Sequence, residues 1–328
     1  MNIFTSVVVG NSGLSDDQKL DVLQILIQVT IRKYSGWDNA SPEAARARLL
    51  FDIESSINRG NCLIFYNGSG PCGLICIDKQ DWDSIYFNLD CYKISHLLVC
   101  ERLQTFDQIE LASLMISQAI GRFAAGARFV FSDADSWNEY HNVALQQRDF
   151  RYVLSWVDGF YAGPKFKINL PDGHSADIIN SQDIAPIKKF VAEAYFRGGR
   201  FFMDANFASL NPIGIYHSLF DNSLKNGDLV FVYRIEGKPV GIFISKNHQV
   251  YEQFNNLSVA HLRYLVVDDC YRGHGIASNL FMSFVNYLTT VSTLIVTGLE
   301  VHNTPSLNLH SKLGFKLNYT HNAFHAWL

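Results

Sequence analysis

The sequence predicts an α/β chain of the α+β kind, built as two tandem units with the same order of helices and strands. Its 328 residues correspond to about two domains at roughly 150 residues each. Hydrophobic residues make up 48% of the chain and charged residues 18%, so each half has enough apolar material for a packed core. The segment 162–165 combines small residues with Pro164 after a long predicted strand, which indicates a boundary between residues 162 and 163.

Periodicity and turn residues predict the elements of the first unit, residues 1–162. Two helices come first, each opened by a serine that can accept a first-turn N–H. The segment 67–71 has turn chemistry between two short apolar strands. The predicted elements are helices 15–33 and 41–58, strands 62–66, 72–77 and 94–99, helix 107–125, strand 128–132, helix 138–147 and strand 150–161.

The second unit, residues 163–328, repeats this order. Its predicted elements are a helix from Ser181, a helix 213–225, strands 229–235, 240–245 and 259–267, helix 275–290, strand 293–299, helix 304–313 and a last strand. Asn138 lies twelve positions before Phe150, and Asn303 lies twelve positions before Phe315, with a short predicted helix between each pair. The match predicts two copies of one unit.

Composition argues against several classes of function. Lys and Arg total 27 against 31 Asp and Glu, so no overall basic field attracts nucleic acid. No stretch reaches the roughly 18 apolar residues that span a bilayer, and we expect a cytoplasmic protein without a membrane partner. The six cysteines form no Cys-x-x-Cys pair, so we expect neither a metal site nor a disulfide framework.

The most informative stretch is the loop after the predicted strand 259–267. Gly273 and Gly275 lie where the loop enters a helix whose first residues are small. Glycines let the backbone wrap an anion, the free N–H groups of the first helical turn point at it, and the helix dipole adds positive potential. The pattern predicts a pyrophosphate cradle, although its spacing fits neither the Walker A nor the dinucleotide motif.

This loop resembles the coenzyme A signature of the GNAT acyltransferase superfamily through Arg272-x-x-Gly275-x-Ala277. The stretch from Asn303 to Phe315 resembles a later motif of the same superfamily. The resemblance implies a mostly antiparallel mixed sheet flanked by helices in each unit, and acyl-coenzyme A as co-substrate without a metal. Because the segment 100–107 contains no glycine, the first unit resembles a degenerate copy that supplies structure and acceptor contacts, and the second the catalytic domain.

The resemblance also implies roles for individual residues. The coenzyme pyrophosphate would lie on the cradle, with Arg272 at its entrance, and the backbone of Leu265 and Val267 would pair with the pantetheine arm. The backbone N–H of Val266 would polarise the thioester carbonyl. Asn303 would touch the coenzyme or, alternatively, cap its helix. The cradle residues are Gly273, His274, Gly275, Ile276, Ala277 and Ser278.

The catalytic groups are less clearly marked. His310 stands where the superfamily usually has a tyrosine that protonates the leaving thiolate, so it is a candidate general acid. The alternative is a packed histidine and a thiolate that leaves unaided. The candidate bases are Asp204, Glu252, Glu300 and His302.

The chain as a whole resembles the dTDP-fucosamine acetyltransferase group of nucleotide-sugar N-acyltransferases, in the segments 82–87, 199–207 and 216–224. This implies transfer of an acetyl or short hydroxyacyl group to a dTDP-linked 3-amino or 4-amino-6-deoxyhexose for surface polysaccharide synthesis. Cations and aromatic faces suit a nucleotide diphosphate sugar. The candidate substrate contacts are Arg200, Phe201, Arg197, Tyr216 and Trp82, with Asp204 as a base or acceptor contact.

Other interpretations stay open. The acceptor can instead be a peptide, a polyamine or another small amine, since this fold serves unrelated acceptors. The chain can also be a non-catalytic acyl-coenzyme A binding protein, because the tyrosine is missing. A homodimer is compatible with the sequence, and so is a monomer.

Overall fold

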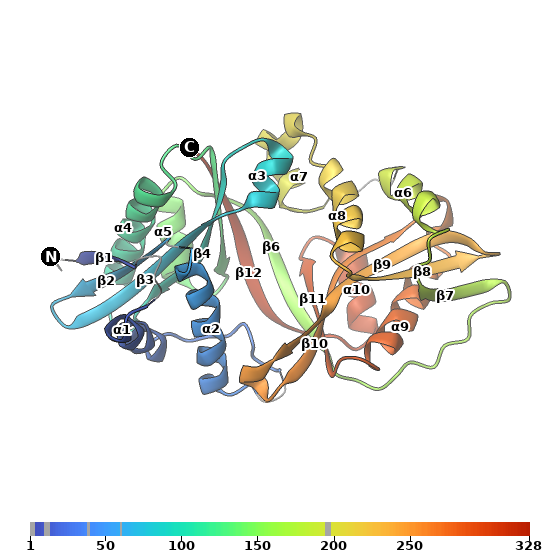
Figure 1. Cartoon of the computed structure of the whole chain (residues 1–328), viewed down its shortest axis with the longest axis horizontal. Helices are drawn as coiled ribbons and strands as arrows, with labels where there is room; N and C mark the ends of the chain where they lie inside the picture. Colours follow the sequence, from blue (N-terminus) through green and yellow to red (C-terminus); the bar gives the residue numbers. More distant parts are fainter. Residues whose placement is uncertain (1–3, 10–13, 38–39, 60, 194–197) are drawn as a thin grey trace. The chain divides into compact units, whose positions relative to one another are not determined.

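The computed structural model describes residues 4–9, 14–37, 40–59, 61–193 and 198–328 and divides the chain into two compact units (Figure 1). Unit 1 comprises Met1–Trp156 with Thr320–Leu328, and unit 2 comprises Val157–Tyr319. The division differs from the expected boundary at residues 162 and 163, because the C-terminal residues pack with the first unit. None of the helices in the described ranges is long and apolar enough to cross a membrane.

Unit 1 is a sheet with helices on both faces. The strand order is β1-β2-β3-β4-β5-β12-β6, and β4 and β5 are parallel. Buried side chains of α4 and α5 cover one face, and those of α1 and α2 the other (Figure 1). Its elements are β1 (Thr5–Val9), α1 (Asp16–Ile27), α2 (Pro42–Ile57), β2 (Cys62–Asn67), β3 (Gly70–Lys79), α3 (Asp81–Phe87), β4 (Cys91–Val99), α4 (Thr105–Phe123), β5 (Phe129–Asp135), α5 (Glu139–Gln147) and β6 (Arg151–Tyr161).

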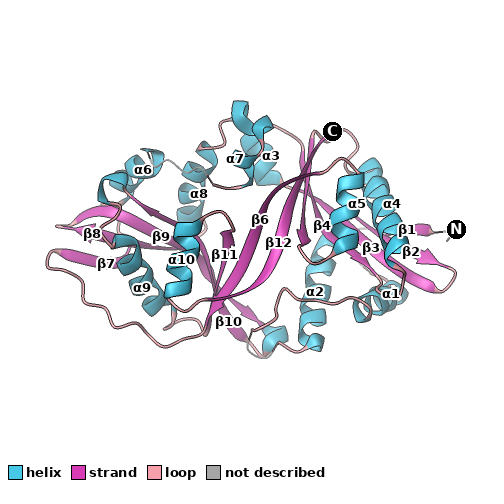
Figure 2. Ribbon diagram, turned by 180° about the vertical axis from the view of Figure 1, so that it is seen from behind, coloured by secondary structure: helices cyan, strands magenta, loops and turns pink. Residues whose placement is uncertain are grey.

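Unit 2 repeats this plan. The strand order is β6-β11-β10-β9-β8-β7, and β10 and β11 are parallel. Helix α9 packs on one face of the sheet, which Figure 2 shows from the side opposite to Figure 1. Helices α6 and α8 pack on the other face. Its elements are β7 (His174–Ile178), α6 (Ile184–Glu193), α7 (Arg200–Met203), α8 (Gly214–Lys225), β8 (Leu229–Ile235), β9 (Lys238–Tyr251), β10 (Leu257–Val267), α9 (Ile276–Leu288), β11 (Leu294–Glu300), α10 (Thr304–Lys312) and β12 (Lys316–Trp327), with 3-10 helices η1 (Ala205–Leu210), η2 (Glu252–Phe254) and η3 (Asp269–Tyr271).

The two repeats exchange their final strands. β12 is the last strand of the second repeat, yet its residues from His321 to Trp327 pair with β5 in unit 1. β6 is the last strand of the first repeat, and its final residues belong to unit 2, where the strand lies beside β11. The exchange gives β5 and β11 a paired neighbour in place of an exposed edge.

Most predicted elements are confirmed, and the differences have local causes. The helix expected over 15–33 begins with a capping box of Ser15 and Gln18 but ends at Ile27. The following segment is held instead by the carboxylate of Glu101, which accepts hydrogen bonds from the backbone and hydroxyl of Thr30. The sequence analysis missed β1, α3, β7, α7 and η1, which are short and show little periodicity.

One disulfide joins two of the six cysteines, although the sequence indicates no disulfide framework. Cys62 and Cys76 are joined, and they are direct partners in the β2–β3 register, with their Cα atoms 4.3 Å apart. Cys72, Cys91 and Cys100 are buried free thiols, as expected of small apolar side chains, and Cys270 is exposed.

An aromatic cluster fixes α9 on the sheet of unit 2. Phe284 stacks on Phe231 of β8 with ring centroids 5.1 Å apart, and Phe281 lies 5.0 Å from Phe243 of β9. Burial of each such ring contributes about 2 kcal/mol to the free energy of unfolding. The cluster therefore sets the position of the α9 N-terminus, where the cradle lies.

Candidate functional site

Two parallel strands part in the middle of unit 2. All residues of β10 and β11 are described, and pairing between them runs only from Val259 with Leu294 to His261 with Val296. β10 continues to Val267, held by β9 along its other edge. Beyond His261 the β10 edge that faces β11 therefore offers backbone groups that need partners.

The predicted pantetheine contacts lie on this separated part of β10. Leu265, Val266 and Val267 pair with Phe243, Ile242 and Gly241 of β9, respectively. Their backbone groups are therefore placed where an extended, peptide-like pantetheine arm could pair with the edge of β10 like an additional strand.

The loop after β10 leads into α9 through two glycines in the left-handed region. Gly273 has φ +83° and Gly275, the residue before the helix, has φ +77°. A Cβ built at either glycine meets no atom within 4 Å, so open space lies beside both. No side chain caps the first turn of α9, which leaves its N–H groups to a ligand.

The cradle combines an exposed loop with a buried helix start. Arg272 donates from Nε to the carbonyl oxygen of Val267 at 3.1 Å and pairs with Asp269 at 2.7 Å. These bonds hold Arg272 beside the end of β10, and its contact with the coenzyme stays a prediction. His274 is exposed, Ala277 and Ser278 are partly buried, and Ile276 packs in the core.

Asn303 has the geometry of a helix cap. Its side-chain oxygen accepts from the N–H of Ser306 at 3.3 Å at the start of α10. Asn138 caps α5 in the same way through His141, so the cap belongs to both repeats. A coenzyme contact by Asn303 stays a prediction beside this structural role.

The candidate general acid His310 is a packing residue. Its ring is 3% exposed and lies edge-on to Phe281 and Phe315. Nδ1 lies 2.8 Å from the carbonyl oxygen of Ser306, and Nε2 lies 3.3 Å from Oγ1 of Thr297. Burial lowers the pKa of His310 to about 4, so the ring is neutral near pH 7 and holds its one proton in the contact with Ser306. The burial and the lowered pKa argue against the acid role, which stays a prediction.

The internal repeat explains why a core side chain stands at position 310. An offset of 165 residues relates Asn138 to Asn303, and the same offset relates Leu145 to His310. Leu145 is fully buried. Phe150 donates its N–H to the carbonyl oxygen of Leu145, as Phe315 does to that of His310.

Glu300, one of four candidate bases, is singled out by the structure. It ends β11 on the same face as Val296, opposite the face where Thr297 meets His310. The side chain is 5% exposed, and burial raises its pKa to about 7. Its Oε2 has no hydrogen-bond donor among the described residues, although Nε2 of the half-exposed His302 lies 3.5 Å away. A buried carboxyl of this kind is a base poised near neutral pH.

Several predicted acceptor contacts have other roles or lie outside what the structure describes. Asp204 caps η1 by accepting from the backbone and side chain of Asn206. Phe201 is buried against Phe207, so its ring is not a platform for a nucleobase. The guanidinium of Arg200 lies 4.6 Å from the Phe201 ring centre and is partly exposed. Arg197 lies outside the described residues, as does the side chain of Tyr216.

Trp82 belongs to unit 1. It lies on α3 and is 42% exposed, with Tyr86 as its aromatic neighbour at 6.4 Å. The exposed indole is compatible with the predicted contact to a flat ligand.

Comparison with protein families matches the part of the chain that carries this geometry. Residues 200–315 match the model of the acetyltransferase (GNAT) family. The matched residues all lie in the second half of the chain, which is similar to GNAT acetyltransferases. The chain is an acyltransferase with acyl-coenzyme A as co-substrate. The degenerate character of the first repeat stays a prediction. No curated protein matches the chain by sequence.

Solved structures share the fold of the whole acetyltransferase. A GCN5-related N-acetyltransferase from Sphaerobacter thermophilus covers 99% of this chain and 95% of its own at TM-score 0.65 and 13% identity. A tandem GNAT protein from the clavulanic acid biosynthesis pathway covers 99% and 98% at TM-score 0.58 and 13% identity. A glucosamine N-acetyltransferase region of a fungal multi-domain β-N-acetylglucosaminidase covers 99% and 38% at TM-score 0.60 and 12% identity. The predicted tandem fold is confirmed.

Replacement of Gly275 by alanine tests the cradle. A Cβ at φ +77° costs about 1–2 kcal/mol and intrudes on the space beside the first turn of α9. We expect acetyl-coenzyme A binding, measured by calorimetry, to weaken at least about tenfold. Gly126→Ala, at φ +84° and also in open space in unit 1, is the matched control. Unchanged binding by Gly275→Ala would contradict the assignment.

Replacement of His310 by leucine, the residue at the equivalent position of the first repeat, tests the packing role. We expect kcat to be retained, whereas loss of a true general acid costs about 10²–10⁴-fold. The folded pKa of about 4 lies below the ordinary value of 6.5, so the contribution of this ring to stability is complete above pH 6.5 and is lost as the pH falls toward 4. Urea unfolding between pH 7 and 5 should therefore show a weaker pH dependence in His310→Leu. An equal pH dependence would contradict the neutral buried ring.

Proposed function

We propose that this acetyltransferase N-acylates the amine of a dTDP-linked amino-dideoxy sugar, a 3-amino or 4-amino-6-deoxyhexose, for surface polysaccharide synthesis. The acyl donor is acetyl-coenzyme A or a short hydroxyacyl-coenzyme A. The main support for N-acylation is the environment of Glu300. Its carboxyl is buried at the end of β11, where the strand has separated from β10, and its raised pKa suits removal of a proton from an amine.

The sugar nucleotide is supported by the segment between α6 and α8. Arg200 opens α7 with a partly exposed guanidinium, and such a group can bind diphosphate oxygens in a forked geometry. One structural relative is described as a glucosamine N-acetyltransferase, an enzyme of an amino sugar.

The residues of unit 2 divide the chemistry among them. The amine nitrogen attacks the thioester carbonyl directly, the carbon–sulfur bond breaks, and the coenzyme leaves as a thiolate without a covalent enzyme intermediate. Glu300 accepts the proton that the amine releases, and His302 at 3.5 Å passes it toward solvent. The backbone N–H of Val266 stabilises the charge on the carbonyl oxygen.

The absence of a dedicated acid is chemically acceptable. A thiolate is a good leaving group because the ordinary pKa of a thiol is only about 8–9. His310, buried and neutral, is not required to protonate it. The cradle N–H groups from Gly273 to Ser278 serve to hold the pyrophosphate at the far end of the coenzyme.

Replacement of Glu300 by glutamine tests the base. We expect kcat to fall by about 10²-fold or more, because the amide cannot accept the proton. In the parent, only the carboxylate form is active, so kcat should rise as the pH passes upward through about 7. Glu252→Gln, an exposed acid from the same set of candidates, is the matched control and should leave the profile unchanged. A Glu300→Gln enzyme with the parental profile would contradict the role.

A thiol-release assay with acetyl-coenzyme A tests the acceptor class. The panel contains dTDP-3-amino and dTDP-4-amino-6-deoxyhexoses, a peptide and spermidine, and we expect release with one nucleotide sugar alone. Arg200→Ala should raise the KM for that sugar by about tenfold or more, because loss of a hydrogen bond to a charged group weakens binding by about that factor. The KM for acetyl-coenzyme A should stay unchanged. Lys225→Ala, an exposed cation at the end of α8, is the control. Thiol release with the peptide or spermidine would contradict the nucleotide sugar as acceptor and would identify that amine as the acceptor instead.

A further inference from the structure

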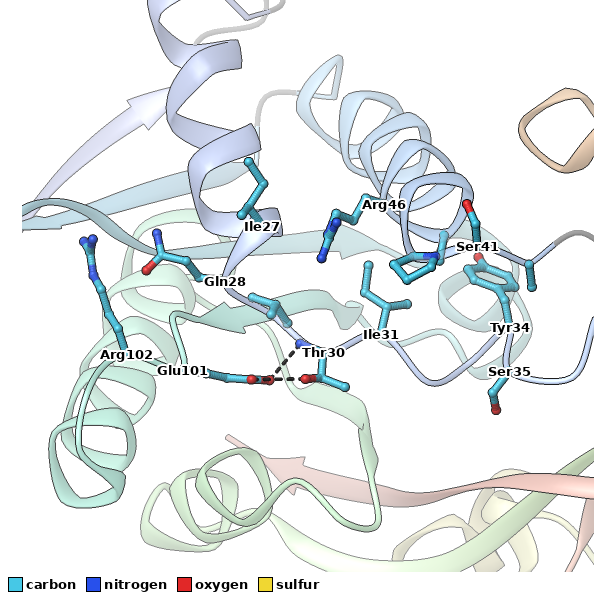
Figure 3. A pocket seen from close by; sticks show the side chains of 14 residues that line it. Ile27, Gln28, Thr30, Ile31, Tyr34, Ser35, Ser41, Arg46, Glu101 and Arg102 are labelled. Carbon is cyan, nitrogen blue, oxygen red and sulfur yellow. Dashed lines mark hydrogen bonds between the residues drawn. The ribbon is translucent and has the colours of Figure 1, made fainter.

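A second candidate site lies in unit 1, away from the chemistry described so far. It is a cavity of about 510 Å³, within the size range of small-molecule pockets (Figure 3). Its walls come from the end of α1, the segment that follows it, the start of α2 and the loop after β4. The lining residues are Ile27, Gln28, Val29, Thr30, Ile31, Tyr34, Ser35, Ala40, Ser41, Pro42, Ala45, Arg46, Glu101 and Arg102.

Hydrogen bonds hold the walls of this cavity in place. The carboxylate of Glu101 accepts from the N–H of Thr30 at 2.7 Å and from its hydroxyl at 3.0 Å, as Figure 3 shows. The N–H of Glu101 donates to the carbonyl oxygen of Gln28 at 3.0 Å. Ser41 caps the facing end of α2. The cavity is therefore preformed, which lowers the entropic cost of binding a ligand.

The repeat shows that this cavity is not a second coenzyme cradle. The loop after β4 corresponds to the loop after β10, where Gly273 and Gly275 leave N–H groups open. In unit 1 the same place holds the carboxylate of Glu101. A fixed negative charge there repels a pyrophosphate.

The opposite part of the cavity carries a cation. Arg46 projects from α2 into the cavity in Figure 3, and its side chain is 32% exposed. Its acidic partner is Glu43, at 3.9 Å and 78% exposed, and such a surface pair contributes little. An oxyanion entering the cavity can thus take the guanidinium without breaking a strong bond.

Between these charges the wall is aliphatic. Ile27, Val29 and Ile31 line it from the α1 side, and Pro42 and Ala45 from the α2 side. Ile27 is 64% exposed, so part of its apolar surface is open to solvent at this wall. A short hydrocarbon covering this wall would remove apolar surface from water.

We propose that unit 1 binds a small amphiphilic anion in this cavity, with its oxyanion on Arg46 and a short aliphatic body along Ile27, Val29 and Ile31. The head group is a carboxylate or a phosphate monoester, which present the same oxyanion chemistry to a guanidinium. This site is independent of the acceptor proposed above.

Calorimetric titration of the full chain with hexanoate, hexyl phosphate and hexylamine tests the proposal. We expect hexanoate or hexyl phosphate to bind, and the tighter of the two identifies the head group. Arg46→Gln should weaken that binding at least about tenfold, the value of a charge-assisted bond, whereas Arg122→Gln, an exposed arginine of α4, should not. Hexylamine binding as tight as that of the anions, no binding of either anion, or unchanged binding by Arg46→Gln would overturn the proposal.

Two further variants separate this site from the coenzyme site. Ile31→Trp fills the cavity and should abolish hexanoate binding while acetyl-coenzyme A still binds, which also shows that the variant is folded. Gly275→Ala should weaken acetyl-coenzyme A and leave hexanoate binding unchanged. If Gly275→Ala instead loses hexanoate binding, the anion occupies the coenzyme cradle and the proposal fails.

Discussion

The parting of β10 from β11 is the feature on which the coenzyme site depends. Parallel strands normally pair along their length, but here pairing stops at His261 and Val296 while β10 runs on to Val267. Because β9 holds the other edge of β10, the strand stays extended and keeps one row of backbone groups open. The glycine loop and the N-terminus of α9 follow directly from the end of this strand, so the sheet edge and the anion cradle form one continuous surface of backbone donors.

Unit 1 shows that the parting belongs to the fold and that the loop decides its use. β4 pairs with β5 only from Cys91 to Ile94 and then continues to Val99, as in the second repeat. The difference lies in the next residues. The carboxylate of Glu101 accepts a hydrogen bond from Thr30. The segment 100–107 also has no glycine that would make its backbone N–H groups accessible to a ligand. Two copies of one architecture thus differ in ligand chemistry through a few residues at one junction.

The sequence predicted what depends on local pattern and missed what depends on pairing across the fold. The cradle was predictable because Gly273 and Gly275 act through their own backbone. The disulfide was not, because Cys62 and Cys76 become neighbours only through the register of β2 and β3. The exchange of β12 was likewise invisible, since its residues would suit either sheet. The burial of His310 was not predictable, because a histidine at this position of a helix has the same sequence pattern whether it faces the core or a ligand.

Two other buried carboxylates of the chain can be compared with Glu300 in their hydrogen bonds and in the direction of their pKa shifts. Asp78 in unit 1 accepts hydrogen bonds from Ser56, Ser95 and Arg59. Asp183 in unit 2 accepts from the N–H of Asn180 and from the guanidinium of Arg234. Both groups have a lowered pKa because these hydrogen bonds outweigh the effect of burial.

Glu300 departs from that pattern. It is as deeply buried, yet no described residue donates a hydrogen bond to its Oε2, His302 being 3.5 Å away, and burial raises its pKa to about 7. An unsatisfied buried acceptor costs about 1–3 kcal/mol, which a purely structural acid would avoid. A base needs that open oxygen, since an acceptor already occupied by protein donors cannot take a proton from a substrate. The proposed role as a base accounts for this arrangement of Glu300, whereas the hydrogen bonds that stabilise the charge of Asp78 and Asp183 have no counterpart at its Oε2 among the described residues.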